Sequence, residues 1–314
     1  MSRYPVSVLG LASAFTLTLA APVGAQAPEL YPPPIVQAKT VKLSAHAWVI
    51  PDGGVRLVPN VGIVVGTAAT LVIDTGMGNG NARTVLAEVA KVSRNKKIYL
   101  VTTHAHAEHT SGMDAFPEDM TFVVARAQQA EMDAAGDRAF AGMAKLSPAI
   151  ATMLQGAKLR KPGIVFEQEH VLDLGGVKAR VIWMGPAHSK GDTVTVVEGE
   201  GVIFAGDIAP RQRFPSLYGD AKRVEFVKAM GRVEALNGRV IVPSHGPWGD
   251  NSIFAEQRKV LDEIAARVAS LKGQGQPLDA VTKTVAAEFR ARYPTWESAI
   301  PNEVEPIIRG VYAE

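Results

Sequence analysis

The chain has 314 residues, of which 47% are hydrophobic and 20% charged, and its formal net charge is +2. This length provides one large domain or two small ones with a substantial core, and the composition is typical of a globular rather than a disordered protein. The small net charge, with no basic cluster longer than RNKK at residues 94–97, argues against a nucleic-acid partner.

The first 25 residues have the layout of a secretory signal peptide. Arg3 is an early cation, a long apolar stretch follows it, and no acidic residue occurs before Glu29. We expect cleavage after Ala25, in the small-residue sequence VGA. Residues 26–41 are a proline-rich connector, and no later segment has the apolar length needed to span a bilayer. The mature protein is therefore expected to be periplasmic or secreted, without a stable membrane anchor.

Strand-like and helical patterns alternate through residues 42–314, which we interpret as one domain. The strand-like segments of its first half are residues 41–50, 61–66, 70–76, 97–103 and 121–125. Between the third and fourth of these, apolar residues recur at helical spacing behind Asn81, which predicts a helix over residues 81–93 with Asn81 as its cap.

A helical stretch rich in Ala, Met and Gln runs from about residue 126 to 161 and is interpreted as an insertion. After it the earlier rhythm returns, with strand-like residues 177–185, 192–199, 201–207 and 239–246, and a helix around 225–236. Amphipathic helices follow from Ile253 onward. Two strand-rich halves, each closed by helices, predict a layered α/β domain.

Three of the seven histidines crowd into the sequence VTTHAHAEHTSGM, directly after a buried strand. His104 and His106 are two residues apart on an extended backbone, so their rings can point to the same side and bind one cation. Glu108 and His109 lie past the turn and can bind a second cation, with Gly112 permitting a tight exit from the loop.

Three more candidate ligands, His188, Asp207 and His245, each follow an apolar strand of the second half. Strand ends that gather at one edge of a sheet would bring them together. Because the chain has no cysteine, these ligands suit Zn²⁺, or Fe or Mn in a two-metal site. His46 and His170 lie on strand-like stretches without such neighbours and are interpreted as structural.

The motifs resemble those of metallo-β-lactamase-fold hydrolases over roughly residues 42–249. The resemblance implies a four-layer αβ/βα sandwich with two metal ions at one edge, and it implies that Asp74, in VIDTG, orients the metal-binding loop. The metal ligands that it implies are His104, His106 and His188 for the first ion, Glu108, His109 and His245 for the second, and Asp207 as a bridge. The family pattern has Asp where this chain has Glu108, so either the longer side chain reaches differently or the loop shifts.

The activity implied by the resemblance is hydrolysis of a small ester, lactone, thioester or related bond by a metal-bridging hydroxide, with Asp207 and Glu108 at the reaction centre. β-Lactam hydrolysis is an alternative, which Asp207 disfavours because the cysteine-free lactamases of this fold lack the bridging acid. Iron-dependent oxygen chemistry and a non-catalytic metal-binding module are further alternatives.

The substrate is expected to be a small molecule that approaches the metals beside the sequence RQRFPSLYGD. Either this segment lines the pocket or it is a plain packed loop. The insertion at 126–161 either covers the site as a lid or packs beside it, and an apolar cover with few charges would favour a small, uncharged substrate. The candidate pocket residues are Arg211, Arg213, Phe214, Tyr218 and, as a wall after His245, Trp248.

Overall fold

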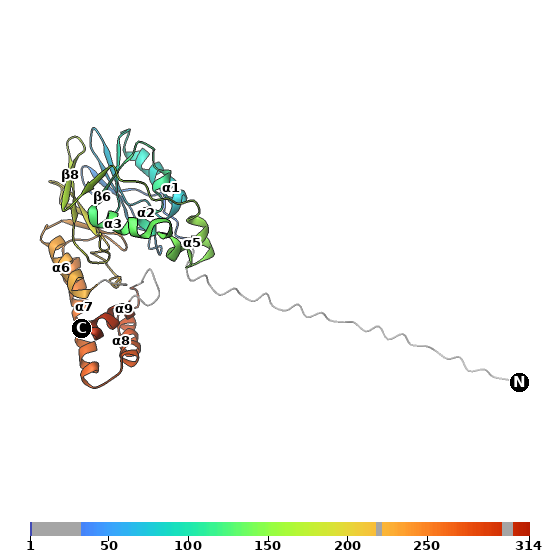
Figure 1. Ribbon diagram of the computed structural model, residues 1–314, viewed down its shortest axis with the longest axis vertical. Helices are drawn as coiled ribbons and strands as arrows, with labels where there is room; N and C mark the ends of the chain where they lie inside the picture. The colour runs from blue at the N-terminus through green and yellow to red at the C-terminus, as the bar shows by residue number, and fades with distance from the viewer. Residues whose placement is uncertain (2–32, 218–221, 297–303) are drawn as a thin grey trace. The chain divides into compact units, whose positions relative to one another are not determined.

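The computed structural model describes residue 1 and residues 33–217, 222–296 and 304–314, so nearly all of the predicted signal peptide lies outside the described residues. A compact unit extends from Tyr31 to Glu314. Within it, two β-sheets are covered by helices (Figure 1).

The first sheet contains seven strands in the order in which they occur along the chain. β1 to β4 pair antiparallel, with short turns after β1 and β3 and a longer loop, residues 51–60, after β2, whereas β4 to β7 are parallel and are connected through helices. The strands are β1 (Val41–Lys42), β2 (Ala47–Ile50), β3 (Val61–Val65), β4 (Thr70–Ile73), β5 (Ile98–Val101), β6 (Thr121–Ala125) and β7 (Ile164–Phe166).

The second sheet contains five strands in the order β12-β11-β10-β9-β8. Neighbours pair antiparallel except for β11 and β12, which are parallel and therefore end at the same edge. The strands are β8 (Glu169–Asp173), β9 (Lys178–Trp183), β10 (Thr193–Val197), β11 (Val202–Gly206) and β12 (Val240–Pro243).

Helices cover the outer faces of both sheets. The regular helices and short 3₁₀ turns are α1 (Gly78–Val92), α2 (Ala107–Thr110), η1 (Met113–Ala115), α3 (Arg126–Ala135), η2 (Gly136–Arg138), α4 (Ala141–Ala144), α5 (Pro148–Met153), α6 (Arg223–Glu234), α7 (Ser252–Gly273), α8 (Leu278–Arg292) and α9 (Val304–Ala313). None of these helices combines the length and the hydropathy that a membrane span requires.

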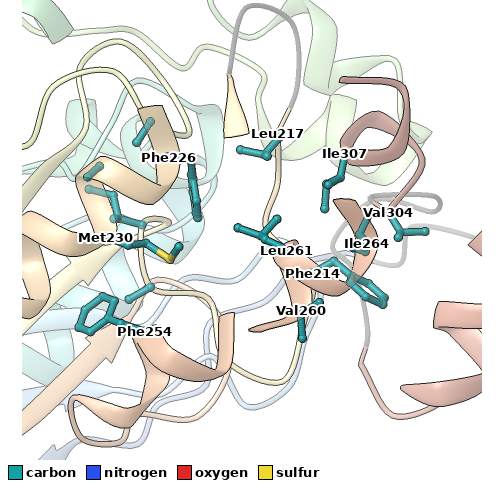
Figure 2. Close-up of a cluster of buried hydrophobic side chains, with 14 of the residues drawn as sticks. Phe214, Leu217, Phe226, Met230, Phe254, Val260, Leu261, Ile264, Val304 and Ile307 are labelled. Carbon is teal, nitrogen blue, oxygen red and sulfur yellow. The ribbon is translucent and has the colours of Figure 1, made fainter. Parts of the chain in front are cut away.

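Alternation of side chains along buried strands produces three apolar layers. On β4, Leu71 and Ile73 pack between the two sheets, while Val72 packs toward α1 on the other face. A third layer lies under α6 to α9 on the outer face of the second sheet, where Phe226 of α6 and Leu261 of α7 are among the buried side chains (Figure 2). The layers helix, sheet, sheet and helix confirm the predicted αβ/βα sandwich.

The predicted helix cap at Asn81 is wrong. α1 begins three residues earlier, at Gly78, and the side-chain amide of Asn81 has a different role. Its Nδ2 donates to the carbonyl of Pro34 at 2.7 Å, and its Oδ1 accepts from the backbone amide of Val36 at 2.9 Å. A buried amide with partners 45 or more residues away holds the connector against α1, which local spacing does not reveal.

The single strand expected over residues 41–50 is two short strands, β1 and β2, that pair with each other. The tight turn between them is held from the second sheet, because Glu200 accepts hydrogen bonds from the side chain of Ser44 and from the backbone amide of His46. The ring of His46 also contacts Glu200. His46 therefore joins two strand turns.

The expected insertion contains three short helices, α3, α4 and α5, and its helical part ends at Met153. Ile150 and Leu154 share a small apolar cluster with Leu57, Met77 and Ala107. Ala107 lies inside the histidine loop, so this part of the insertion packs beside that loop.

Candidate metal centre

The histidine loop begins where β5 ends at Val101, and after residues 102–106 it enters the four-residue helix α2. His106 has an extended backbone just before α2, and the helical turn that follows carries the buried side chains of Glu108 and His109. Gly112 does not have a left-handed conformation, since its φ is −91°. A Cβ atom there would lie 2.6 Å from the Cβ of Ala82 in α1. Glycine is therefore required by the close packing against α1 and not by the backbone conformation of the turn.

His104, His106 and His188 form the first cluster, in which one ligand atom from each residue lies within 4.8 Å of the others. The Nε2 atom of His188 is 3.1 Å from Nδ1 of His106. The other ring nitrogen of His188, Nδ1, donates to the carbonyl of Ser216 at 2.7 Å, which leaves Nε2 as the free ligand atom. The buried Nε2 of His104 has no hydrogen-bond partner among the described residues.

Glu108, His109 and His245 form the second cluster, under the same 4.8 Å limit. Oε2 of Glu108 and Nε2 of His109 are buried and have no hydrogen-bond partner in the described part of the chain. The ring of His245 donates through Nδ1 to the carbonyl of Val58 at 2.9 Å, so its Nε2 faces the cluster. Glu108 is 5% exposed, so its carboxylate is buried in the cluster rather than solvated at the loop surface.

Asp207 follows β11 and lies between the two clusters. Its Oδ2 is 3.4 Å from Nε2 of His188 in the first cluster, and its Oδ1 is 3.9 Å from Nε2 of His245 in the second. It also groups with His104 and His109 as a third set of potential ligands. One carboxylate thus turns one oxygen toward each cluster, as a residue that bridges two ions must.

Asp74 ends β4 and holds the histidine loop rather than joining either cluster. Its Oδ2 accepts from Nδ1 of His109 at 2.9 Å, and its Oδ1 accepts from the backbone amide of Thr103 at 2.8 Å. The first bond fixes the ring so that Nε2 of His109 is available to an ion. Asp74 has a φ of 69°, an uncommon left-handed conformation that short polar residues such as Asp tolerate best.

The buried groups shift one another's pKa values. Burial, which disfavours a charged ring, lowers the pKa of His106 and of His245 to about 3. Burial also opposes charge on His109, but nearby carboxylates, with Asp74 first among them, outweigh it and raise the pKa to about 9. Burial alone would raise the pKa of Asp207, yet the neighbouring imidazoles hold it below its usual range.

The donor set fits two divalent ions. Imidazole nitrogens and carboxylate oxygens without thiolate are ligands for Zn²⁺, Fe or Mn, and each cluster offers three of them. The unpaired buried atoms of His104, Glu108 and His109 are the observation that favours a bound cation, because buried polar atoms otherwise find partners. The sequence-predicted ligands therefore all meet at one edge of the sandwich.

The predicted pocket residues are more dispersed. Arg211 donates to the carbonyl of Trp248 at 2.6 Å, and the half-buried Trp248 packs against the core between the sheets. Phe214 is 3% exposed and packs on Tyr293 and Trp296, so its ring belongs to the core of the C-terminal helices (Figure 2). Tyr218 lies outside the described residues.

A cavity of about 260 Å³ lies beside the turn that carries His245. Arg56, Arg211 and Arg213 contribute its cationic groups, and Asp52 its acidic one. Arg213 is close enough to the metal ligands to help lower the pKa of Asp207. Sequence reasoning did not find Arg56, which precedes β3 and is far along the chain from every motif.

Several supporting residues also escaped sequence reasoning. Asp192 accepts from the backbone amide and the hydroxyl of Ser189, directly after His188. Glu131 of α3 accepts from the backbone amides of Lys190 and Gly191, each at 2.9 Å. An acid four residues after a histidine in a glycine-containing turn was a usable signal for Asp192, whereas nothing local pointed to Glu131.

The sequence profile described as the metallo-beta-lactamase superfamily matches residues 54–245, more than half of the chain. No curated protein matches the sequence. Among solved structures, a metallo-beta-lactamase from Pontibacter korlensis is similar with a TM-score of 0.58 and 20% identity, over 71% of this chain and 98% of that one. DIM-1 metallo-beta-lactamase is similar with a TM-score of 0.55 and 13% identity, over 70% and 94%.

A further similar structure is the sec-alkylsulfatase Pisa1 from Pseudomonas sp., with a TM-score of 0.65 and 15% identity. The similarity covers 87% of this chain, but this chain spans only 49% of the sulfatase. At these identities the neighbours support the fold.

Replacement of Glu108 by Ala tests its assignment as a ligand. We expect Glu108→Ala to weaken binding at the second cluster about 10- to 100-fold or more, because a buried acidic ligand is lost, while the first cluster retains its three histidines. Stepwise Zn²⁺ dissociation constants, measured by chelator competition on the folded variant, check this. Glu118→Ala, at an exposed acid, is the matched control. Two ions bound as tightly as in the parent would remove Glu108 from the ligand set.

Proposed function

This chain belongs to the metallo-beta-lactamase superfamily, and on that footing we propose that it is a two-metal hydrolase of small molecules. The observation that carries the proposal is the position of Asp207, whose two carboxylate oxygens face two separate ligand clusters. A site built for one ion has no need of the second cluster. The absence of cysteine and the borderline character of imidazole favour zinc in both positions.

Held by these two clusters, two divalent ions would lower the pKa of water toward neutrality and would polarise the bond under attack. The chain's own residues orient the ligands. Asp74 holds Nδ1 of His109, and the carbonyls of Ser216 and Val58 hold Nδ1 of His188 and His245. In the neutral form of each of these rings, which metal binding requires, the hydrogen-bonded nitrogen carries the proton, so the opposite nitrogen presents a lone pair to the cluster.

We propose a small ester, lactone or thioester as the substrate. The modest cavity beside the His245 turn supports a small molecule, and its three arginines favour one that carries negative charge. This departs from the uncharged substrate expected from the insertion, because those arginines precede β3 or follow β11 and lie outside the insertion. Sulfate esters therefore belong among the candidates. The similarity to the sec-alkylsulfatase, which covers 87% of this chain, also supports them.

Metal removal tests the proposed activity. We expect chelation to abolish hydrolysis of a panel of carboxylate esters, lactones, thioesters and sulfate esters, and Zn²⁺ to restore it. Asp207→Ala should reduce turnover by at least about 100-fold, because one residue supports both ligand clusters. His170→Ala is the control, since His170 stacks on Phe166 away from the clusters.

Full activity in folded Asp207→Ala would contradict the mechanism. Stoichiometric iron with oxygen consumption, in protein purified without added metal, would instead support the oxygenase alternative. Metal binding without turnover of any member of the panel would support the non-catalytic alternative.

We further propose that the protein is exported and loses residues 1–25. The support is the signal-peptide pattern of the sequence. Pro34 and Val36, which Asn81 holds against α1, follow the predicted cut, so cleavage removes neither contact. Intact-mass analysis of protein from the periplasm or medium should show a chain that begins at Gln26. A mature species that still begins at Met1 would refute this proposal.

A further inference from the structure

The turn that carries His245 leaves the end of β12 and depends on contacts with a distant loop, residues 51–60 between β2 and β3. Asn60 makes the largest number of these contacts. Its side-chain Nδ2 donates to the carbonyl of Pro243 at 2.9 Å and to the carbonyl of Gly246 at 2.8 Å. Its backbone amide donates to the carbonyl of Ser244 at 2.6 Å. One residue thus satisfies three carbonyl acceptors, two before His245 and one directly after it.

Asp52 completes the arrangement from the start of the same loop. Its Oδ2 accepts from the backbone amide of Gly246 at 2.7 Å. Its own backbone amide donates to Oδ1 of Asn60 at 2.8 Å, so Asp52 also holds the side chain of Asn60 in place. Asn60 is 4% exposed, and water has little access to replace the bonds it makes.

The same loop also fixes the ring of His245. Val58 lies two residues before Asn60, and its carbonyl accepts from Nδ1 of His245 at 2.9 Å. The ring of His245 and the backbone of both neighbouring residues are therefore held by a loop between two strands of the first sheet, although His245 itself follows β12 of the second. His109, its neighbour in the second cluster, is likewise held by Asp74 of the first sheet.

The first cluster has separate supports. His188 is held by the carbonyl of Ser216, and its turn is held by Asp192 and by Glu131. None of the hydrogen bonds described for this cluster involves residues 51–60. A disturbance of Asn60 should therefore reach one cluster and spare the other.

We propose that Asn60 and Asp52 are positioning residues that set the affinity of the second ion by holding His245. The inference rests on the two-metal centre of the proposed function, and not on which bond that centre cleaves. Supporting groups that orient a ligand change metal affinity about 10- to 100-fold when they are removed. The effect here is expected in that range and at one ion only.

The test measures stepwise Zn²⁺ dissociation constants by chelator competition, on full-length variants whose fold is checked by circular dichroism. Asn60→Asp is nearly isosteric, but it replaces the amide donor with an acceptor that faces two carbonyls. We expect it to weaken the second ion about 10- to 100-fold and to leave the first unchanged. Asp52→Ala should weaken the second ion as well. Asp52→Asn should restore it, because an amide oxygen can still accept from Gly246.

Asn95→Ala is the matched control. Nδ2 of Asn95 donates to the carbonyl of Gly66 at 2.8 Å and to the hydroxyl of Thr70 at 3.1 Å. Gly66 follows the end of β3 opposite to Asn60, and the length of β3, about 17 Å, separates the two ends. This variant loses a comparable set of amide bonds and should leave both ions bound as in the parent.

Equal weakening of both ions in Asn60→Asp and Asp52→Ala, or no weakening in either, would overturn the inference while the two-metal proposal stands. If Asn60→Asp does not fold, the pair Asp52→Ala and Asp52→Asn decides by the same criterion. A parent protein that binds fewer than two Zn²⁺ ions would overturn the proposed function and this inference together.

Discussion

Buried polar atoms without a partner destabilise a folded protein, and this fold brings several to one place. Nε2 of His104, Nε2 of His109 and Oε2 of Glu108 are buried at the same edge of the sandwich without a hydrogen-bond partner among the described residues. The Nδ1 atoms of both rings are engaged in hydrogen bonds, so a cation is the natural counterpart for these remaining lone pairs. The loops at this edge hold these atoms close enough together for one cation to contact several of them.

Each half of the sandwich supplies ligands, and hydrogen bonds between the halves keep them in register. The first sheet supplies the histidine loop after β5, and the second supplies His188, Asp207 and His245. The ring of His245 is held by a carbonyl from the first sheet, and the His188 turn by Glu131 from α3. The spacing of the two clusters thus depends on how the sheets pack on each other through the apolar layer between them.

Sequence reasoning succeeded where the physical signal is local. Strands buried on both faces are continuous apolar runs, and ligands placed directly after such runs converge at a sheet edge, which is why His104, His188 and Asp207 could be placed together in advance. It failed where a side chain bonds to backbone far along the chain. The sequence predicts a helix cap at Asn81, which instead holds the connector, and it gives no signal at Asn60, whose backbone acceptors lie 183 residues or more away. Backbone acceptors leave no pattern in a sequence.

Glu108 also combines a feature that is visible in the sequence with one that depends on distant packing. The sequence identified it as a departure from the usual aspartate, but whether the longer arm turned inward depended on packing that no local pattern encodes. The helix α2 and the close contact of Gly112 with Ala82 bring the loop against α1, and the carboxylate is buried beside His109. The additional methylene group is therefore accommodated within the cluster.

Anomalous X-ray diffraction at the zinc absorption edge, from crystals of the protein loaded with Zn²⁺, tests the central claim most directly. The account predicts two peaks, one surrounded by His104, His106 and His188, and the other by Glu108, His109 and His245, with Asp207 between them. A single peak, or two peaks with Glu108 turned away from both, would contradict it.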